Sequence, residues 1–298
     1  ASVTPDAEMA ANIASLAGPI NEVMQTVVAE TSAPIDGDRG NCRAKECEMG
    51  VLVAEAMLDK VADQGVTIAI QNGGGLRASI DAGEVTMGEV LTVLPFQNTL
   101  ATFKLSGADV VTALENGVSR LEDGAGRFPQ VAGLRYAFDA AAAPGSRITE
   151  VQVMAGGDWA AIDPAAMYGV VSNNYMRGGG DGYSTFANNA VDAYDFGPGL
   201  EQVVADYLAA NSPYQPALRG AIVMGASFSG DAAPAPAATE TAATGAESSG
   251  GYIVKAGDTL WEIAKAKLGD ATRYTEIVEL NGLTAGATLS IGQELKLP

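Results

Sequence analysis

Apolar residues recur at helical spacing near the start of the chain. Between residues 6 and 29 they recur three or four positions apart at Met9, Ile13, Leu16, Ile20 and Val23, and Met24 lies four positions after Ile20. This spacing places them on one face of a helix. Thr4 and Pro5 precede the run as cap and first-turn residues. The pattern predicts a leading helix whose chain passes into a strand near residues 25–31.

A mixture of helices and strands is predicted over the next two hundred residues. A helix over 48–64 ends at Gly65, and residues 66–70 form a short β-branched apolar run typical of a buried strand. Further strands are predicted at 100–104, 134–138, 148–154 and 168–172, and further helices at 107–119 and 200–210. The fold class predicted is α/β (α+β), with mixed sheets flanked by helices and an end near residue 228.

The composition changes abruptly after residue 228. Residues 229–251 contain almost only Ala, Pro, Thr, Ser, Glu and Gly, which predicts a disordered linker without a packed core. Patterned sequence then resumes as a strand at 252–255, helices near 260–267 and 273–280, and a strand at 294–297. Four parts are therefore expected: a leading helix and strand over 1–29, a larger domain over 30–228, the linker, and a small βααβ domain over 252–298.

The charge balance narrows the range of partners. The 298 residues include 17 Lys plus Arg and 36 Asp plus Glu, for a formal charge of -19. Such a chain repels polyanions, so nucleic acid polymers are poor candidates. A small anionic ligand stays possible, because a few local arginines are enough to hold it. The apolar runs are all shorter than the about 20 residues of a membrane span, so none is expected.

Two cysteines and no histidines limit the chemistry. Cys42 and Cys47 lie five positions apart. A reduced pair or a partial metal site is an alternative, but no further Cys or His exists to complete a zinc shell, so a local disulfide and an oxidising compartment are favoured. The absence of histidine excludes Ser-His-Asp and Cys-His catalysis. The chain alone therefore presents a weak case for catalysis, and we predict no metal site in it.

A glycine-rich loop follows the predicted buried strand. It reads Asn72-Gly73-Gly74-Gly75-Leu76-Arg77. Loops that leave the carboxyl edge of a sheet are where α/β folds place ligands, and glycines allow close approach of the backbone. An ordinary tight turn is the alternative interpretation.

A series of motifs in order along the chain resembles the C-terminal domain of the 5'-nucleotidase family, which includes animal ecto-5'-nucleotidase and bacterial UDP-sugar hydrolases. The resemblance covers roughly residues 5–226. Besides the glycine loop, the motifs are Cys42-Arg43, Glu46-Cys47-Glu48-Met49-Gly50, Gly83-Glu84-Val85-Thr86, Leu94-Pro95-Phe96-Gln97-Asn98, Leu105-Ser106-Gly107, Leu114-Glu115, Phe128-Pro129-Gln130-Val131-Ala132-Gly133 and Gly179-Gly180-Asp181-Gly182-Tyr183.

This resemblance implies a nucleotide or nucleoside ligand, and it implies site residues. Phe96 and Tyr175 correspond to the two rings between which the family clamps the base, although the family often has Phe at the second position. The other substrate-binding residues implied are Arg43, Asn72, Gly74, Arg77 and Asp181. Core aromatic residues and surface arginines are the simpler alternatives. Planar arginine forks suit phosphate oxygens or hydroxyl pairs. Which nucleotide is preferred does not follow from the sequence.

The same resemblance implies a second domain outside these 298 residues. The family carries out phosphoric ester hydrolysis in an N-terminal metallophosphoesterase domain that binds two divalent metals, of the Zn or Mn type. We expect that domain to act with this chain either in cis, as part of a longer protein, or in trans. In the family, the leading helix joins the two domains.

Residues 252–298 resemble a LysM domain. The matching segments are Tyr252-Ile253-Val254-Lys255-Ala256-Gly257-Asp258-Thr259-Leu260-Trp261-Glu262-Ile263-Ala264, Asn281-Gly282-Leu283 and Ile291-Gly292-Gln293-Glu294-Leu295-Lys296-Leu297-Pro298. The family binds N-acetylglucosamine glycans such as peptidoglycan. The resemblance implies a glycan groove lined by two loops, whose residues are Gly257, Asp258, Thr259, Leu260, Asn281, Gly282 and Leu283.

Taken together, the two resemblances imply the nucleotide-recognition part of a nucleotidase of nucleotide catabolism, tethered to peptidoglycan. The expected location is the periplasm or cell surface of a bacterium. Two other classes remain as alternatives: a non-catalytic nucleotide-binding protein, and a wall-anchored structural protein whose pocket has lost its ligand.

Overall fold

The structure is a computed structural model, and it divides into two compact units, Ala1–Ala238 and Thr239–Pro298. It describes residues 6–225, 227–228, 252–254, 263, 267–268, 274–281, 283 and 293–297. The predicted linker over 229–251 lies outside the described residues.

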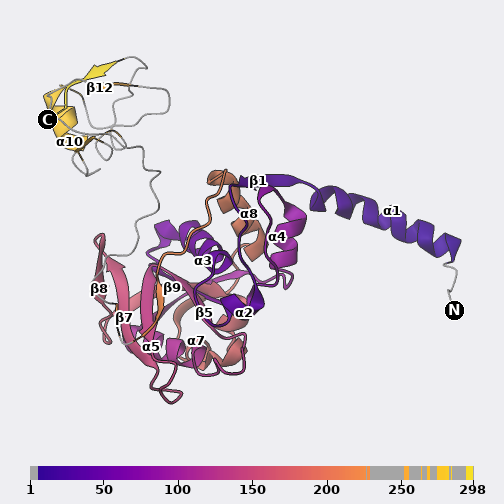
Figure 1. The fold of residues 1–298 in the computed structure, drawn as a ribbon, viewed down its shortest axis with the longest axis horizontal. Helices are drawn as coiled ribbons and strands as arrows, with labels where there is room; N and C mark the ends of the chain where they lie inside the picture. Colours follow the sequence, from indigo (N-terminus) through magenta and orange to yellow (C-terminus); the bar gives the residue numbers. More distant parts are fainter. Residues whose placement is uncertain are drawn as a thin grey trace. The chain divides into compact units, whose positions relative to one another are not determined.

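The first unit alternates helices with strands, as its sequence pattern predicts (Figure 1). Its α-helices are α1 (Ala7–Met24), α2 (Arg39–Cys42), α3 (Glu48–Lys60), α4 (Met87–Val93), α5 (Gly107–Gly117), α6 (Asn174–Arg177), α7 (Ser184–Asn188) and α8 (Leu200–Ala210). Its strands are β1 (Val27–Thr31), β2 (Ile68–Asn72), β3 (Gly83–Thr86), β4 (Leu100–Ser106), β5 (Pro129–Ala132), β6 (Leu134–Phe138), β7 (Ile148–Ala155), β8 (Asp158–Ala161), β9 (Met167–Asn173), β10 (Val191–Tyr194) and β11 (Ile222–Met224).

A mixed five-stranded sheet lies at the centre of this unit, in the order β10-β4-β9-β2-β5. Strand β2 runs parallel to β9 and antiparallel to β5, and all five of its residues are buried. Ile68 and Ile70 pack into one hydrophobic core with α5, while Ala69 packs into another with α3 and α8. Because successive side chains of a strand face opposite sides, this split shows that helices cover both faces of the sheet.

Two smaller sheets complete the first unit. A four-stranded sheet, in the order β11-β6-β7-β8, shares the core of α5, and β1 pairs with β3 in an antiparallel ribbon. The mixed sheets and flanking helices confirm the predicted fold class. Strand β6 and helix α8 have the predicted bounds, while α3 ends at Lys60 and is followed by a 3-10 turn over Ala62–Gln64.

The predicted disulfide between Cys42 and Cys47 is present. Its loop is held against the central sheet by Gln130, a fully buried residue of β5. The Gln130 amide nitrogen donates to the carbonyls of Cys42 (3.0 Å) and Lys45 (2.7 Å), and its oxygen accepts from the Cys47 amide (3.3 Å). A buried side chain that satisfies three main-chain groups fixes the path of the loop.

A buried carboxylate joins the same loop to the approach to β11. The Glu46 oxygens accept hydrogen bonds from the amides of Gly220 (2.8 Å) and Ala221 (3.0 Å). Burial raises the pKa of Glu46, and the hydrogen bonds from these amides and the charge of Arg219 only partly oppose that effect.

Helix α1 carries its predicted apolar stripe on an exposed face. The exposed members are Met9, Ile13, Leu16, Ile20 and Val23. The helix meets the rest of the unit near its last turn, where Gly88 of α4 lies close to Met24. No helix within the described ranges is long and apolar enough to cross a membrane.

The second unit contains the outer strands and one helix of the predicted βααβ pattern. Strand β12 (Tyr252–Ile253) pairs antiparallel with β13 (Glu294–Leu295), and α10 spans Tyr274–Leu280. The buried core consists of Val254, Ile263, Ile277 and Leu295. Of the other predicted helix, residues 263 and 267–268 are described, and they are helical; residues 264–266 lie outside the described residues.

Two glycines with nearly the same positive φ allow a matched test of the fold. Gly133, between β5 and β6, has φ 69°, and an added Cβ would lie 2.0 Å from the Thr67 carbonyl oxygen. Gly65 has φ 71° but open space around that position. We expect Gly65→Ala to destabilise by about 1–2 kcal/mol through backbone strain alone. Gly133→Ala should cost about 1–3 kcal/mol more. Urea unfolding of both variants measures the difference, and equal losses would contradict this packing.

Glu46 gives a prediction about pH. A raised pKa means that the folded protein holds this proton more tightly than the unfolded chain does. Its contribution therefore favours folding at low pH and declines as pH rises from the ordinary glutamate pKa of about 4.3 through the raised value. The Glu46→Gln variant lacks this titration. The unfolding free energy of the wild type minus that of the variant should fall with rising pH, as urea melts at successive pH values can measure.

Glu122 provides a control of opposite sign. A hydrogen bond from Arg147 lowers the pKa of the exposed Glu122 carboxyl, so its contribution is lost as pH falls below the ordinary glutamate pKa. The unfolding free energy of the wild type minus that of the Glu122→Gln variant should rise with pH. If the same difference for the Glu46→Gln variant also rises with pH, the raised pKa assigned to Glu46 is wrong.

Candidate functional site

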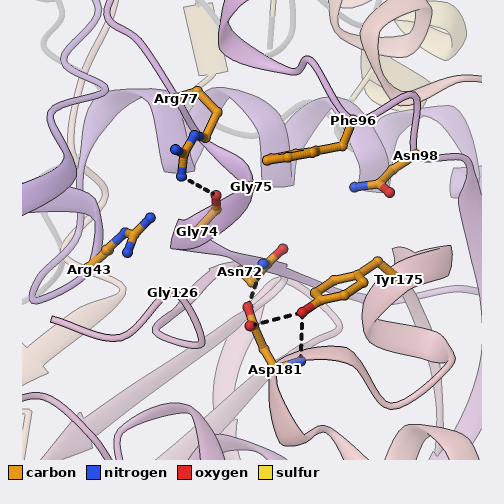
Figure 2. Close-up of a pocket in the computed structure, with 10 residues that line it drawn as sticks. All are labelled: Arg43, Asn72, Gly74, Gly75, Arg77, Phe96, Asn98, Gly126, Tyr175 and Asp181. Carbon is orange, nitrogen blue, oxygen red and sulfur yellow. Dashed lines mark hydrogen bonds between the residues drawn. The ribbon is translucent and has the colours of Figure 1, made fainter. Parts of the chain in front are cut away.

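A pocket of about 530 Å³ opens in the first unit. Its lining residues are Arg43, Asn72, Gly74, Gly75, Arg77, Phe96, Asn98, Gly126, Tyr175 and Asp181 (Figure 2). All seven substrate-binding residues that the family resemblance implies are among them. The fold thus brings together residues that are up to 138 positions apart, from Arg43 to Asp181. Their contact with a ligand stays a prediction.

The floor of the pocket lies where two parallel strands end side by side. Asn72 is the last residue of β2 and Asn173 the last of β9. The buried Asn173 amide nitrogen donates to Asn72 Oδ1 (3.0 Å) and to Gln71 Oε1 (2.8 Å). Asn72 Nδ2 in turn donates to Asp181 Oδ2 (2.7 Å). With its oxygen and its nitrogen both engaged, the Asn72 amide is fixed in one orientation.

The glycine loop contacts a second glycine-containing loop at the pocket wall. Gly73–Gly75 forms a 3-10 turn, and the Gly74 amide donates to the Gly126 carbonyl (2.7 Å). A Cβ on Gly74 would lie 2.7 Å from the Gly126 Cα, and one on Gly126 would lie 3.0 Å from the Gly74 Cα. Neither position has room for a side chain. The glycine loop therefore forms a tight turn and also makes a close contact with the loop that contains Gly126.

Two aromatic rings occupy one side of the pocket. Phe96 lies on the loop after α4 and Tyr175 lies on α6, and their side chains are 55% and 49% exposed. Figure 2 shows the two rings one above the other, with open space between them. Both residues are exposed, so the alternative that they are core aromatic residues is wrong. Arg77 lies over the Phe96 ring, with its guanidinium carbon 5.7 Å from the ring centroid.

Tyr175 is fixed to Asp181 through its hydroxyl group. The hydroxyl lies 3.2 Å from Asp181 Oδ1, to which it donates, and 3.2 Å from the Asp181 amide, from which it accepts. Burial and the Asp181 charge raise the pKa of Tyr175. Asp181 has φ 56°, in the left-handed region, so the loop conformation itself directs this carboxylate.

Two arginines give the other side of the pocket a positive charge. Arg43, in the disulfide loop, is only 8% exposed; its Nη1 donates to the Gly124 carbonyl (3.2 Å), and its buried Nε has no hydrogen-bond partner in the described part of the chain. Burial, Arg39 and Arg77 lower the pKa of Arg43. Arg77 is exposed and donates to the Gly74 carbonyl (3.3 Å). Adjacent cations with free donors suit an anion.

Three lining residues are not among the substrate-binding residues predicted from the sequence: Gly75, Asn98 and Gly126. Asn98 follows Phe96 by two positions in the same motif, so its position in the loop was a usable signal. Its amide carries both donors and an acceptor. Gly126 belongs to a segment with no periodic pattern, and only the close contact with Gly74 reveals it.

A metal site in the part of the chain that the structure describes would require a cluster of side chains that bind metals. No cluster there of three or more His, Cys, Asp or Glu side chains could hold a metal ion.

The predicted glycan-binding residues of the second unit are described only in part. Gly257, Asp258, Thr259, Leu260 and Gly282 lie outside the described residues, and Leu283 packs against the small core. The Asn281 amide nitrogen donates to the carbonyls of Ile277 (2.8 Å) and Lys296 (2.8 Å), and its oxygen accepts from the Lys296 amide (2.8 Å). Asn281 thus joins the end of α10 to the residue after β13. Its contact with a glycan stays a prediction.

Comparisons with known proteins place both units. Residues 26–188 match the family described as 5'-nucleotidase, C-terminal domain, and residues 252–298 match the LysM domain. Among curated proteins, a trifunctional nucleotide phosphoesterase of Bacillus subtilis is 45% identical over 169 residues, which are 56% of this chain and 12% of that protein. Human 5'-nucleotidase is 31% identical over 209 residues, which are 65% of this chain and 36% of the human protein.

A solved structure agrees with these matches. The 5'-nucleotidase precursor of Thermus thermophilus superposes with a TM-score of 0.69 at 39% identity, covering 74% of this chain and 44% of that one. The chain therefore spans less than half the length of each of these relatives. The family match covers more than half of the chain, and the fold and the motifs agree with it. The chain belongs to the 5'-nucleotidase family, of which it carries the C-terminal domain.

Proposed function

We propose that the first unit recognises nucleotides by holding the base between Phe96 and Tyr175. The observation that carries this proposal is the pair of exposed rings that share one pocket with two arginines and a carboxylate. Aromatic faces stack on any base, for about 1–3 kcal/mol per base. Exposed rings with open space between them are suited to this task.

The remaining lining residues suit the other parts of a nucleotide. Asp181 has lone pairs that can accept from ribose hydroxyls. Arg43 and Arg77 each donate one printed hydrogen bond to a main-chain carbonyl, so their guanidinium groups keep further donors for phosphate oxygens. The chain as a whole carries a formal charge of -19, which repels an anionic ligand at long range. The two arginines provide the local positive charge that attracts such a ligand in the pocket.

We assign the chemical step to a different domain. Relatives of this chain are named as 5'-nucleotidases and as a nucleotide phosphoesterase. By analogy, we propose that this unit serves a hydrolase of phosphoric esters in nucleotide catabolism. Its metallophosphoesterase domain, with two divalent ions of the Zn or Mn type, would act in cis or in trans. Such ions polarise the phosphate and activate water, whereas this chain would select and orient the substrate.

The second unit supplies a proposed anchor. LysM domains bind N-acetylglucosamine glycans, so we propose that residues 252–298 attach the protein to peptidoglycan in the periplasm or at the surface of a bacterium. The disulfide between Cys42 and Cys47 agrees with an oxidising compartment. A tethered recognition unit would work at a raised local concentration near the wall.

The ring pair gives a direct test by calorimetry. Adenosine should bind the full chain, and Phe96→Ala and Tyr175→Ala should each weaken that binding by about 1–3 kcal/mol, because each change removes one stacking face. Phe196→Ala is the matched control, since Phe196 is 82% exposed and does not line the pocket. Its affinity should equal that of the wild type. Unchanged binding in Phe96→Ala, or an equal loss in Phe196→Ala, would contradict the proposed slot.

Cosedimentation with purified peptidoglycan tests the anchor. The full chain should pellet with the glycan and be released by N-acetylglucosamine oligomers. A chain that ends at residue 228 lacks the second unit, so it should stay in the supernatant and still bind adenosine. If the shortened chain pellets equally well, the anchor lies elsewhere.

A further inference from the structure

The Tyr175 hydroxyl makes both of its hydrogen bonds with a single residue. It donates to the Asp181 carboxylate and accepts from the Asp181 main-chain amide, each at 3.2 Å. A phenylalanine at this position would provide the same ring face without either bond. The hydroxyl group is therefore superfluous for stacking, and its contacts are directed entirely at the carboxylate and its backbone.

The Asp181 carboxylate is held at both of its oxygens. Oδ1 accepts from Tyr175 (3.2 Å) and Oδ2 accepts from Asn72 (2.7 Å). An ionised carboxylate has about four acceptor positions. Two are occupied by the protein, so about one remains on each oxygen. Two neighbouring acceptors of this kind match two adjacent hydroxyl donors.

The backbone at Asp181 is fixed from both sides as well. Its amide donates to Tyr175, and its carbonyl accepts from the Asn116 side-chain amide (3.2 Å). These bonds hold a non-glycine residue at φ 56°, a conformation that costs free energy and needs support from its surroundings. Loss of the hydroxyl removes one of the supports.

The Tyr175 ring has a separate support. A Cβ on Gly180 would lie 2.5–2.6 Å from the ring atoms Cζ, Cε1 and Cε2, so the ring rests directly on the Gly180 backbone. The packing surface of the ring therefore does not depend on the hydroxyl. Stacking and carboxylate positioning can be separated by removing one oxygen atom.

We propose that Tyr175 is a positioning residue that aims the Asp181 carboxylate at the adjacent 2' and 3' hydroxyls of a ribose, so that the pocket selects ribonucleosides over nucleosides without these hydroxyls. This inference rests on the proposed nucleotide recognition. It assigns two roles to one side chain: the ring faces the base, and the hydroxyl sets the sugar contact.

Calorimetry with the full chain and two ligands tests the proposal. Adenosine carries both hydroxyls, and 2',3'-dideoxyadenosine carries neither. The Tyr175→Phe variant should bind adenosine about tenfold more weakly than the wild type, the scale of one hydrogen bond to a charged group. Its affinity for dideoxyadenosine should change by less than about twofold, because the ring and its support remain. Retained dideoxyadenosine binding also reports that the variant is folded.

A double-mutant cycle shows whether the hydroxyl acts through Asp181. In an Asp181→Ala background, where no side-chain oxygen is left to be positioned, Tyr175→Phe should have no further effect on adenosine binding. Tyr168→Phe is the control, since that hydroxyl accepts from the Asp163 amide (2.9 Å) and Tyr168 does not line the pocket. It should bind both ligands like the wild type.

Three results would overturn the proposal. Unchanged adenosine binding in Tyr175→Phe would show that the hydroxyl does not position the carboxylate. Equal losses for adenosine and dideoxyadenosine would show that it supports only the ring. If the wild type binds neither nucleoside, the proposed function itself fails, and this inference fails with it.

Discussion

The pocket depends on one amide group at the end of the central strand. Asn72 accepts from Asn173 on the neighbouring strand and donates to Asp181 on a loop 109 residues away in sequence. A buried polar group must find partners or lose about 1–3 kcal/mol. Asn72 makes both of these contacts when β2, β9 and the Asp181 loop lie together. The requirement to satisfy one side chain thus couples the packing of the sheet to the geometry of the site.

Much of the fold follows from local pattern, and the exceptions have a physical cause. Strand β2 overlaps a continuous apolar run, and helix α8 buries apolar residues at helical spacing, so sequence alone predicts both elements. Among the strands that are not predicted, β8 and β10 are almost wholly exposed and carry little apolar signal. Their place in a sheet comes from pairing with β7 and β4, which depends on contacts distant in sequence.

The candidate site is likewise predictable from the sequence only in part. The motifs around Phe96, Arg77 and Asp181 identify residues that line the pocket, because these segments resemble motifs of the 5'-nucleotidase family. The contacts among them are a different matter. That Tyr175 bonds to Asp181, or that Gly126 meets Gly74, depends on loops whose approach no local pattern encodes. Sequence therefore suggests the members of the site, while the three-dimensional structure supplies their orientation.

The small covalent loop around Arg43 has a thermodynamic consequence. The bond between Cys42 and Cys47 closes the segment that presents Arg43 to the pocket. Coupling between two events is reciprocal: if the closed loop favours an anion at Arg43, the anion favours the closed loop by the same free energy. On the proposed function, a filled pocket would resist thiol reductants better than an empty one, and the substrate would protect the cross-link that helps to hold it.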